Sequence, residues 1–170
     1  DANDGVHGNA LYKSDGTASG IVMLKDINNI NTIYHEDDLD WFTAFGDTLY
    51  FSGDDGINGQ ELWKSDGTVS GTVMVKNINP TNGLDANAMI ISTSDYVLFR
   101  ADDGTHGTEL WRSDGTTSGT VMVKDILTGS QSSHPSHSSS FIPALGDTIF
   151  LVATDNSGRM MWQSNGTDSG

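Results

Sequence analysis

The chain has 170 residues, and its 23 acidic and 8 basic side chains give a formal net charge of −15 at pH 7. Contact with phosphates needs a basic surface, so this balance excludes nucleic acid and anionic membranes as partners. The absence of cysteine excludes disulfides, thiolate catalysis and cysteine-based zinc sites. The apolar runs are too short to span a membrane, so we expect no membrane insertion.

One seven-residue pattern recurs along the chain at a near-constant spacing. Its clearest copy is Leu62-Trp63-Lys64-Ser65-Asp66-Gly67-Thr68. The serines of the four copies, at intervals of 51, 48 and 51 residues, are Ser14, Ser65, Ser113 and Ser164. Such self-similarity over about 50 residues is typical of proteins built from repeated structural units.

Each complete unit is predicted to hold four short antiparallel strands. The candidate strands are rich in β-branched and aromatic residues, and Gly, Asp, Asn and Ser bound them. No window shows a capped helical period. The whole region 1–170 is taken as one repeat-built domain, with a partial unit at 1–27, complete units at 41–78 and 89–126, and a partial unit at 141–170. In chain order the predicted first strands are 41–45, 89–93 and 141–145, and the second strands are 48–53, 96–101 and 148–153; the third strands are the Glu-Leu-Trp-Lys segments and the fourth strands the Val-Met-Val-Lys segments.

The predicted strands are apolar on both faces. In Thr72-Val73-Met74-Val75 the two valines point one way and Met74 the other. Sheets of this kind must be covered on both sides, and four strands in about 50 residues is the size of a propeller blade. The predicted fold is therefore an all-β propeller of four-stranded antiparallel blades; a β-solenoid and a stacked β-sandwich are the alternatives.

A blade at the end of such a stack would leave an apolar face uncovered. We therefore expect further blades, supplied by a longer parent chain or by a homo-oligomer. Two chains of about three and a half units each would give a ring of about seven blades.

The signature resembles the ELWxxDGT repeats of large bacterial surface and secreted proteins. Residues 61–68 and 109–116 match that pattern directly. The first copy departs from it with Ala10 and Tyr12, and the last with Met160 and Asn165. The resemblance covers essentially the whole chain. It implies an extracellular or cell-surface location and a scaffolding or adhesive role, with no shared reaction.

Acidic loops precede the third strands and are the candidate metal sites. Clustered carboxylates on a tight glycine turn supply the oxygen ligands that calcium prefers. The alternative is a solvated hairpin turn held by the same aspartates. The residues that would bind calcium are Asp1, Asn3, Asp54, Asp55, Asp102 and Asp103.

The aromatic and histidine positions have structural interpretations as well as functional ones. Trp63, Trp111 and Trp162 share one mid-strand position, which favours a core role over sugar stacking. His7 and His106 occupy equivalent loop positions, but Asn58 takes that position in the unit between them, which argues against a repeated metal site. The H-x-x-H at 134–137 lacks a third zinc ligand nearby.

No catalytic constellation is visible, since the chain lacks a G-x-S-x-G elbow and a carboxylate pair in an apolar setting. We therefore expect no enzyme and no certain cofactor. The expected function is a non-catalytic extracellular module for adhesion, scaffolding or protein–protein contact. The alternatives are a calcium-assisted propeller lectin with a glycan ligand and, less favoured, a glycan-processing enzyme.

Overall fold

The protein is all-β, as predicted. The structure is a computed structural model that describes residues 2–4, 6–7, 9–28, 39–80, 84, 89–136 and 144–169. These residues include fourteen strands and one short 3₁₀ turn, η1 (Ala18–Gly20). In this part of the chain no helix is long and apolar enough to cross a membrane.

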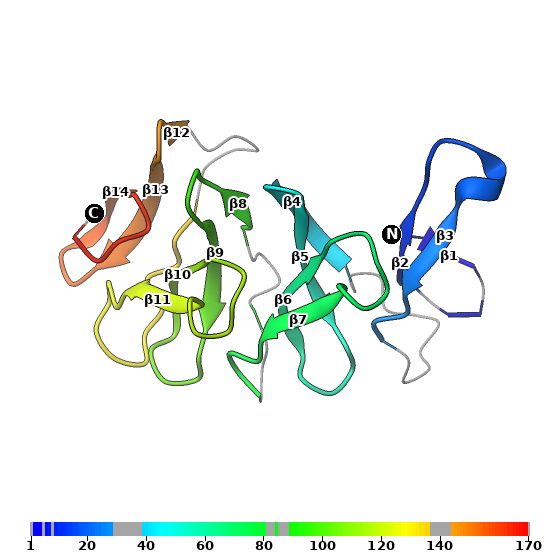
Figure 1. The fold of residues 1–170 in the computed structure, drawn as a ribbon. Helices are drawn as coiled ribbons and strands as arrows, with labels where there is room; N and C mark the ends of the chain where they lie inside the picture. The colour runs from blue at the N-terminus through cyan, green and yellow to red at the C-terminus, as the bar shows by residue number, and fades with distance from the viewer. Residues whose placement is uncertain are drawn as a thin grey trace.

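Two sheets of four antiparallel strands form the middle of the molecule (Figure 1). In each sheet every strand pairs with the next one along the chain, as the tight turns predict. The first sheet comprises β4 (Leu39–Phe45), β5 (Thr48–Asp54), β6 (Gln60–Ser65) and β7 (Val73–Lys76). The second comprises β8 (Ile91–Ser92), β9 (Val97–Asp102), β10 (Thr108–Ser113) and β11 (Val121–Lys124).

Two sheets of three described strands flank the central pair. The N-terminal sheet holds β1 (Ala2–Asn3), β2 (Asn9–Lys13) and β3 (Val22–Lys25). The C-terminal sheet holds β12 (Ala144–Leu145), β13 (Thr148–Asp155) and β14 (Gly158–Ser164). Strand β1 falls in a segment for which the sequence predicted only a loop, and it pairs with β2.

The first strand of each unit departs from its predicted length. The strand predicted at 89–93 is reduced to β8, and Met89, two residues before it, has a left-handed φ of 51°. Trp41, the equivalent residue 48 positions earlier, has a φ of 56°. There the pairing of β4 with β5 shifts register between Asp40 and Thr43. The predicted strand at 141–145 lies partly outside the described residues; β12 covers its last two positions.

The Ser-Asp-Gly-Thr segment forms the turn predicted for it. Asp66 Oδ1 accepts hydrogen bonds from the Thr68 amide at 2.9 Å and the Thr68 hydroxyl at 2.7 Å. Ser65 Oγ accepts from the Gly67 amide at 3.2 Å, and Gly67 takes a φ of 83° that favours glycine. The turn is therefore held by its own side chains.

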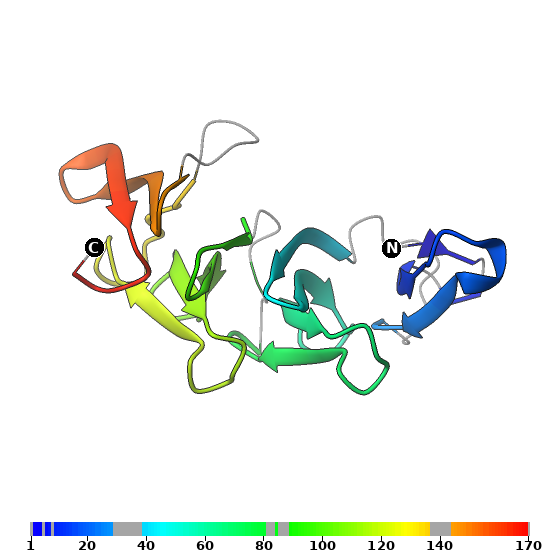
Figure 2. The same cartoon turned by 45° about the horizontal axis from the view of Figure 1, so that its top comes forward.

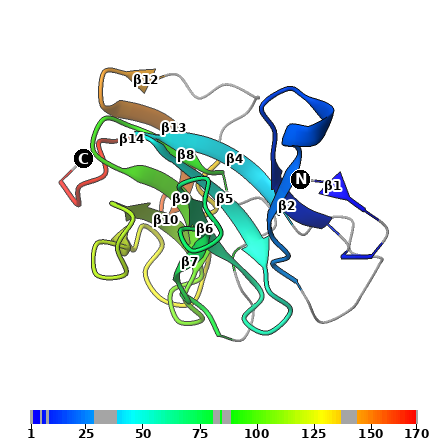
Figure 3. The same ribbon diagram turned by 45° about the vertical axis from the view of Figure 1, so that its right-hand side comes forward.

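The four sheets stack face to face in chain order and form an open arc (Figures 1 and 2). The two ends of the chain lie at opposite ends of the arc, and the view in Figure 3 shows the sheets one behind another. The described residues form no closed barrel or ring. Strands β7 and β11 lie along the convex side in Figure 2.

Each junction between neighbouring sheets holds one hydrophobic cluster. One sheet contributes leucine, with valine added at the second and third junctions, and the next contributes its tryptophan and other apolar side chains. The first junction includes Leu11, Leu24, Phe51 and Trp63; the second includes Leu62, Val75, Phe99 and Trp111; the third includes Leu110, Val123, Leu151 and Trp162. The core of the protein therefore lies between sheets.

Candidate functional site

The acidic loops of the calcium prediction are hydrogen-bonded turns. Asp55 Oδ1 accepts from the amides of Ile57 at 2.9 Å and Asn58 at 2.8 Å, and its Oδ2 accepts from Asn58 Nδ2 at 2.7 Å. Asp54 Oδ1 accepts from the Gly56 amide at 2.6 Å. The backbone amides lower the pKa of Asp55 against the opposing effect of its desolvation. Both oxygens of Asp55 are thus engaged by its own loop.

The loop at residues 102–106 repeats this arrangement. Asp103 Oδ1 accepts from the amides of Thr105 and His106 at 2.9 Å, and Asp102 Oδ1 accepts from the Gly104 amide at 2.7 Å. Among the described residues no group of three or more His, Asp or Glu side chains could hold a metal ion. Of the other two predicted ligands, Asp1 lies outside the described residues, and Asn3 is described only by its backbone in β1.

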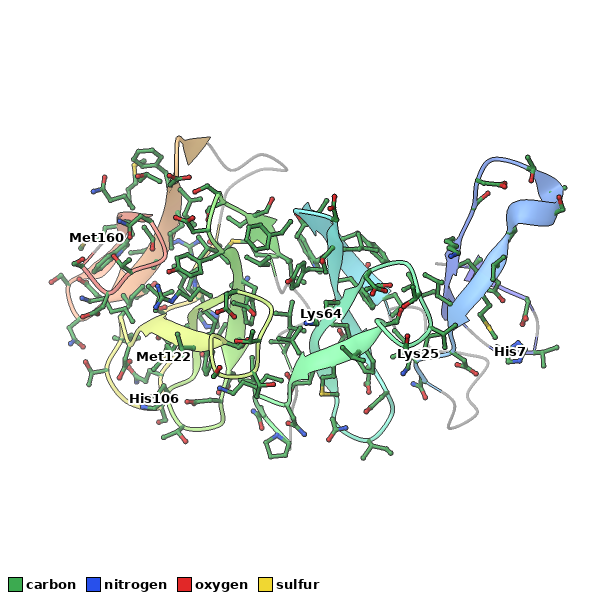
Figure 4. The ribbon with its side chains drawn as sticks, in the orientation of Figure 1. His7, Lys25, Lys64, His106, Met122 and Met160 are labelled. Atoms are coloured by element: carbon green, nitrogen blue, oxygen red, sulfur yellow. The ribbon has the colours of Figure 1, made fainter. Side chains whose placement is uncertain are left out.

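The loop histidines pair with the aspartates of their own turns. His106 Nδ1 lies 2.8 Å from Asp103 Oδ2, and His7 Nδ1 lies 2.6 Å from Asp4 Oδ2. The hydrogen bond to each aspartate is the main cause that raises the pKa of the histidine. Both histidines lie in loops on the lower side of the sheets in Figure 4. Asn58 makes the equivalent bond in the unit between them, so histidine and asparagine serve the same turn.

The H-x-x-H pair at 134–137 lies only partly within the described residues. His134 is exposed, with a φ of 47°, and His137 lies outside the described residues.

The predicted core role of the repeated tryptophan is confirmed at two positions. Trp63 is 5% exposed and Trp111 is 6% exposed, each inside a junction cluster. Trp63 Nε1 donates to the Gly53 carbonyl at 3.0 Å. The ammonium of Lys25 lies 5.6 Å from the ring centre of Trp63, and that of Lys76 lies 5.7 Å from the ring centre of Trp111, which adds a cation–π attraction across each junction.

A basic residue in each of the first three copies of the signature bonds to the next sheet. Its side chain donates to the carbonyl of the glycine in the neighbouring Ser-Asp/Asn-Gly-Thr turn. The contacts, each 2.8 Å long, are Lys13 to Gly67, Lys64 to Gly115 and Arg112 to Gly166 (Lys64 is labelled in Figure 4). Sequence reasoning missed this contact, although a basic residue at all three positions was a signal for it.

The glutamate of the signature is a buried carboxylate with a structural role. Glu61 is 0% exposed, and its Oε1 accepts from the amides of Ile78 at 2.9 Å and Asn79 at 3.0 Å. Its Oε2 is buried and has no hydrogen-bond partner among the described residues. Desolvation raises the pKa of Glu61 to about 7, well above the ordinary value of 4.5. The residue therefore fixes the segment that follows β7.

Glu109 holds the equivalent segment after β11. Its oxygens accept from the Ile126 amide at 3.2 Å and from the Ser133 amide at 3.1 Å and hydroxyl at 2.6 Å. Burial raises the pKa of Glu109 as well. The recurrence of glutamate at this position was visible in the sequence, but its partners were not.

A pocket of about 350 Å³ opens at the third junction. Its apolar wall comes from both sheets, and turn residues 167–169 lie at its rim. Leu110, Val123 and Ile126 line it from one sheet, and Leu151 and Trp162 line it from the other. The described part of the chain therefore has a concave apolar site, although no sequence motif marked it.

Comparisons with protein-family models, with curated proteins and with solved structures found no match for the chain. The functional proposal below is therefore based on the contacts within the structure. The recurring contacts are those of sheet-to-sheet packing, hydrogen bonding between units and self-capped turns.

Proposed function

We propose that the chain is a non-catalytic extracellular module made of β-propeller blades, which serves as a scaffold or adhesive surface. The observation that carries the proposal is the equivalence of the three junctions. Each buries a leucine against the aromatic face of the next sheet, and each adds a basic side chain bonded to a glycine carbonyl. Repeated units that stack through identical contacts in an arc are suited to forming a ring.

The last sheet supports further stacking. Met161 occupies the signature position of Leu62, and it is 74% exposed where Leu62 is 0% exposed. Met161 lies opposite Val152 in the sheet, so its side chain leaves from the face opposite to that of Trp162. A sheet that exposes the apolar face its neighbours bury is a docking surface for another blade.

Light scattering together with electron microscopy of the chain tests the proposal. We expect an assembly larger than one chain, with blades visible around a central axis. The variant Met161→Asp should weaken the association, because it places a charge on the stacking face. A well-folded monomer at all concentrations would contradict the ring.

Glycan binding is the second candidate function. Trp41 is 37% exposed and Phe42 is 43% exposed, and Phe42 stacks on Phe51 with ring centres 5.5 Å apart. Exposed aromatic rings held by a strand can stack on sugar faces. A glycan array probed with the chain and with Trp41→Ala tests this, and repeating it with a chelator tests whether calcium takes part.

A further inference from the structure

In the unit that comprises β4–β7, a side-chain contact links the loop before the third strand to the segment after the fourth strand. Asn77, the residue that follows β7, donates from its Nδ2 to Asn58 Oδ1 at 2.6 Å. Asn58 in turn donates from its Nδ2 to Asp55 Oδ2 at 2.7 Å. Asn58 therefore ties its own loop to the chain that leaves β7.

The two members of this contact are exchanged together in the neighbouring units. Histidine replaces Asn58 and aspartate replaces Asn77 in both of them, as His7 with Asp26 and as His106 with Asp125. A neutral amide pair is thereby replaced twice by an imidazole and a carboxylate, a pair whose charge depends on pH. The paired exchange indicates that the two positions act as one contact.

The protonation state of His106 determines what its second ring nitrogen can bind. Its Nδ1 lies 2.8 Å from Asp103 Oδ2, which accepts the Nδ1 proton (His106 is labelled in Figure 4). The neutral ring then has an unprotonated Nε2 that can only accept, whereas Nε2 of the imidazolium is a donor. Asp125 Oδ1 is buried and has no hydrogen-bond partner among the described residues. That oxygen is an acceptor for the donor that only the protonated ring supplies.

The charges that face His106 favour the protonated ring. The hydrogen bond to Asp103 is the main cause that raises the pKa of His106, and the charges of Asp125 and Glu109 raise it further against the effect of desolvation. Glu109 belongs to β10, and Asp125 belongs to the segment after β11. The backbone at 131–132 lies against the same loop and brings no charged side chain. Each charged group around the ring is therefore an acid.

The loop that carries His106 also touches the preceding unit. The uncharged side chain of Asn79, in the segment after β7, lies 3.6 Å from the position that a Cβ on Gly104 would occupy. Glu61 accepts from the Asn79 amide at 3.0 Å and so holds that segment in place. A change in this loop is therefore adjacent to the second junction as well as to its own unit.

We propose that His106 and Asp125 form a pH-operated latch between the loop at 102–107 and the segment after β11. The latch is closed when the protonated ring bridges Asp103 and Asp125, and it opens when the ring loses its proton. The contact between Asn58 and Asn77 contains no titratable group and stays closed.

The direction of the pH effect follows from the raised pKa of His106. The latch adds stability that is fully present below the ordinary pKa of 6.5 and is lost as the pH rises through the raised value. His7 and Asp26 repeat the arrangement in the N-terminal unit, where the hydrogen bond to Asp4 and the charge of Asp26 raise the pKa of His7. This regulation goes beyond the scaffold role proposed above, and it does not depend on the formation of a ring.

Nitrogen-15 NMR of the imidazole rings between pH 5.5 and 9 tests the latch in the unaltered chain. We expect the neutral His106 ring to carry its proton on Nδ1. Asp125→Asn should lower the pKa of His106, whereas Asp147→Asn, which removes an exposed carboxylate from the last sheet, should leave it unchanged. A neutral ring protonated on Nε2, or the same pKa of His106 in Asp125→Asn and the parent chain, would overturn the proposal.

Amide hydrogen exchange at pH 6 and pH 9 locates the opening. Protection at 104–107 and 126–129, corrected for the intrinsic exchange rates, should fall between these pH values. The fall should be roughly two- to fivefold larger than at 56–59 and 78–79, as expected for a partly exposed ion pair. Both units contain the buried glutamate, so its titration affects both sets of amides and the difference reports the histidine.

Exchange of the two pairs gives the sharpest test. Asn58→His combined with Asn77→Asp should transfer the pH dependence to the central unit, and His106→Asn combined with Asp125→Asn should remove it from the third. Thermal melts at pH 6 establish that both variants are folded. Folded variants whose pH dependence stays where it was would refute the latch. If neither variant folds, equal changes of protection in the two units of the parent chain would refute it instead.

Discussion

The buried carboxylate of Glu61 makes this protein less stable as the pH rises toward neutrality. Its pKa is raised to about 7 in the folded chain, against about 4.5 when exposed. The folded state therefore holds a proton on Glu61 between these two values, and the unfolded state does not. The stability that this proton confers is fully present below pH 4.5 and is lost as the pH rises through about 7.

The size of the effect follows from the two pKa values. Each pKa unit of difference is worth about 1.4 kcal/mol, so the ionisation of Glu61 costs on the order of 3 kcal/mol between pH 4.5 and 8. Glu61→Gln cannot ionise and keeps an oxygen for the amides of Ile78 and Asn79. Its stability relative to the parent chain should therefore improve by about that amount as the pH rises across this range.

Urea denaturation of both proteins between pH 4.5 and 8 measures the difference. Glu61→Ala removes the acceptor of two buried amides and should be destabilised by roughly 1–3 kcal/mol per amide at pH 4.5. Because alanine cannot ionise either, this deficit relative to the parent chain should shrink as the pH rises to 8. Asp66→Asn is a matched control, because Asp66 is exposed and bonds to Thr68 keep its pKa below the ordinary value, so its titration falls below this window. If the difference between Glu61→Gln and the parent chain were constant across the range, the reasoning would be refuted.

Three further predictions concern the turns and the junctions. Gly115→Ala should lose about 1–3 kcal/mol more stability than Gly16→Ala in thermal melts. Both glycines have a φ near 90°, at 87° and 88°, but only at Gly115 would an added Cβ meet the Tyr50 hydroxyl. Equal losses in the two variants would disprove the contact. Trp111→Ala should lose on the order of 3–5 kcal/mol of stability, and a variant that melts normally would remove this tryptophan from the core. Addition of calcium or a chelator should leave the melting temperature unchanged, because loop amides already donate to Asp103; a shift of several degrees would instead support the predicted metal site.

Local features of the fold could be predicted from the sequence because local chemistry determines them. Strand positions follow from β-branched and aromatic runs, and turns such as the one at Asp66 need only their own side chains. The position of Trp63 inside a sheet that is apolar on both faces was enough to place it in the core. These signals act over a few residues and need no knowledge of the neighbouring unit.

Features that join distant residues could not be predicted in the same way. Glu61 bonds to backbone amides 17 and 18 residues away, and Lys64 bonds to a carbonyl 51 residues away. A backbone partner has no side chain to identify it in the sequence. Met89, just before the shortened β8, takes a left-handed backbone conformation that methionine does not favour intrinsically. The pocket depends on side chains from two sheets and has no local pattern at all.

The basic side chains of the junctions have a consequence for how such chains can vary. Lys13, Lys64 and Arg112 all donate to a main-chain oxygen, and a main-chain oxygen is present whatever residues surround it. Substitution in the accepting sheet leaves the acceptor in place, and lysine and arginine both reach it. Units that keep a basic residue and a glycine turn therefore keep this contact when they are exchanged or duplicated, while their exposed loops diversify independently.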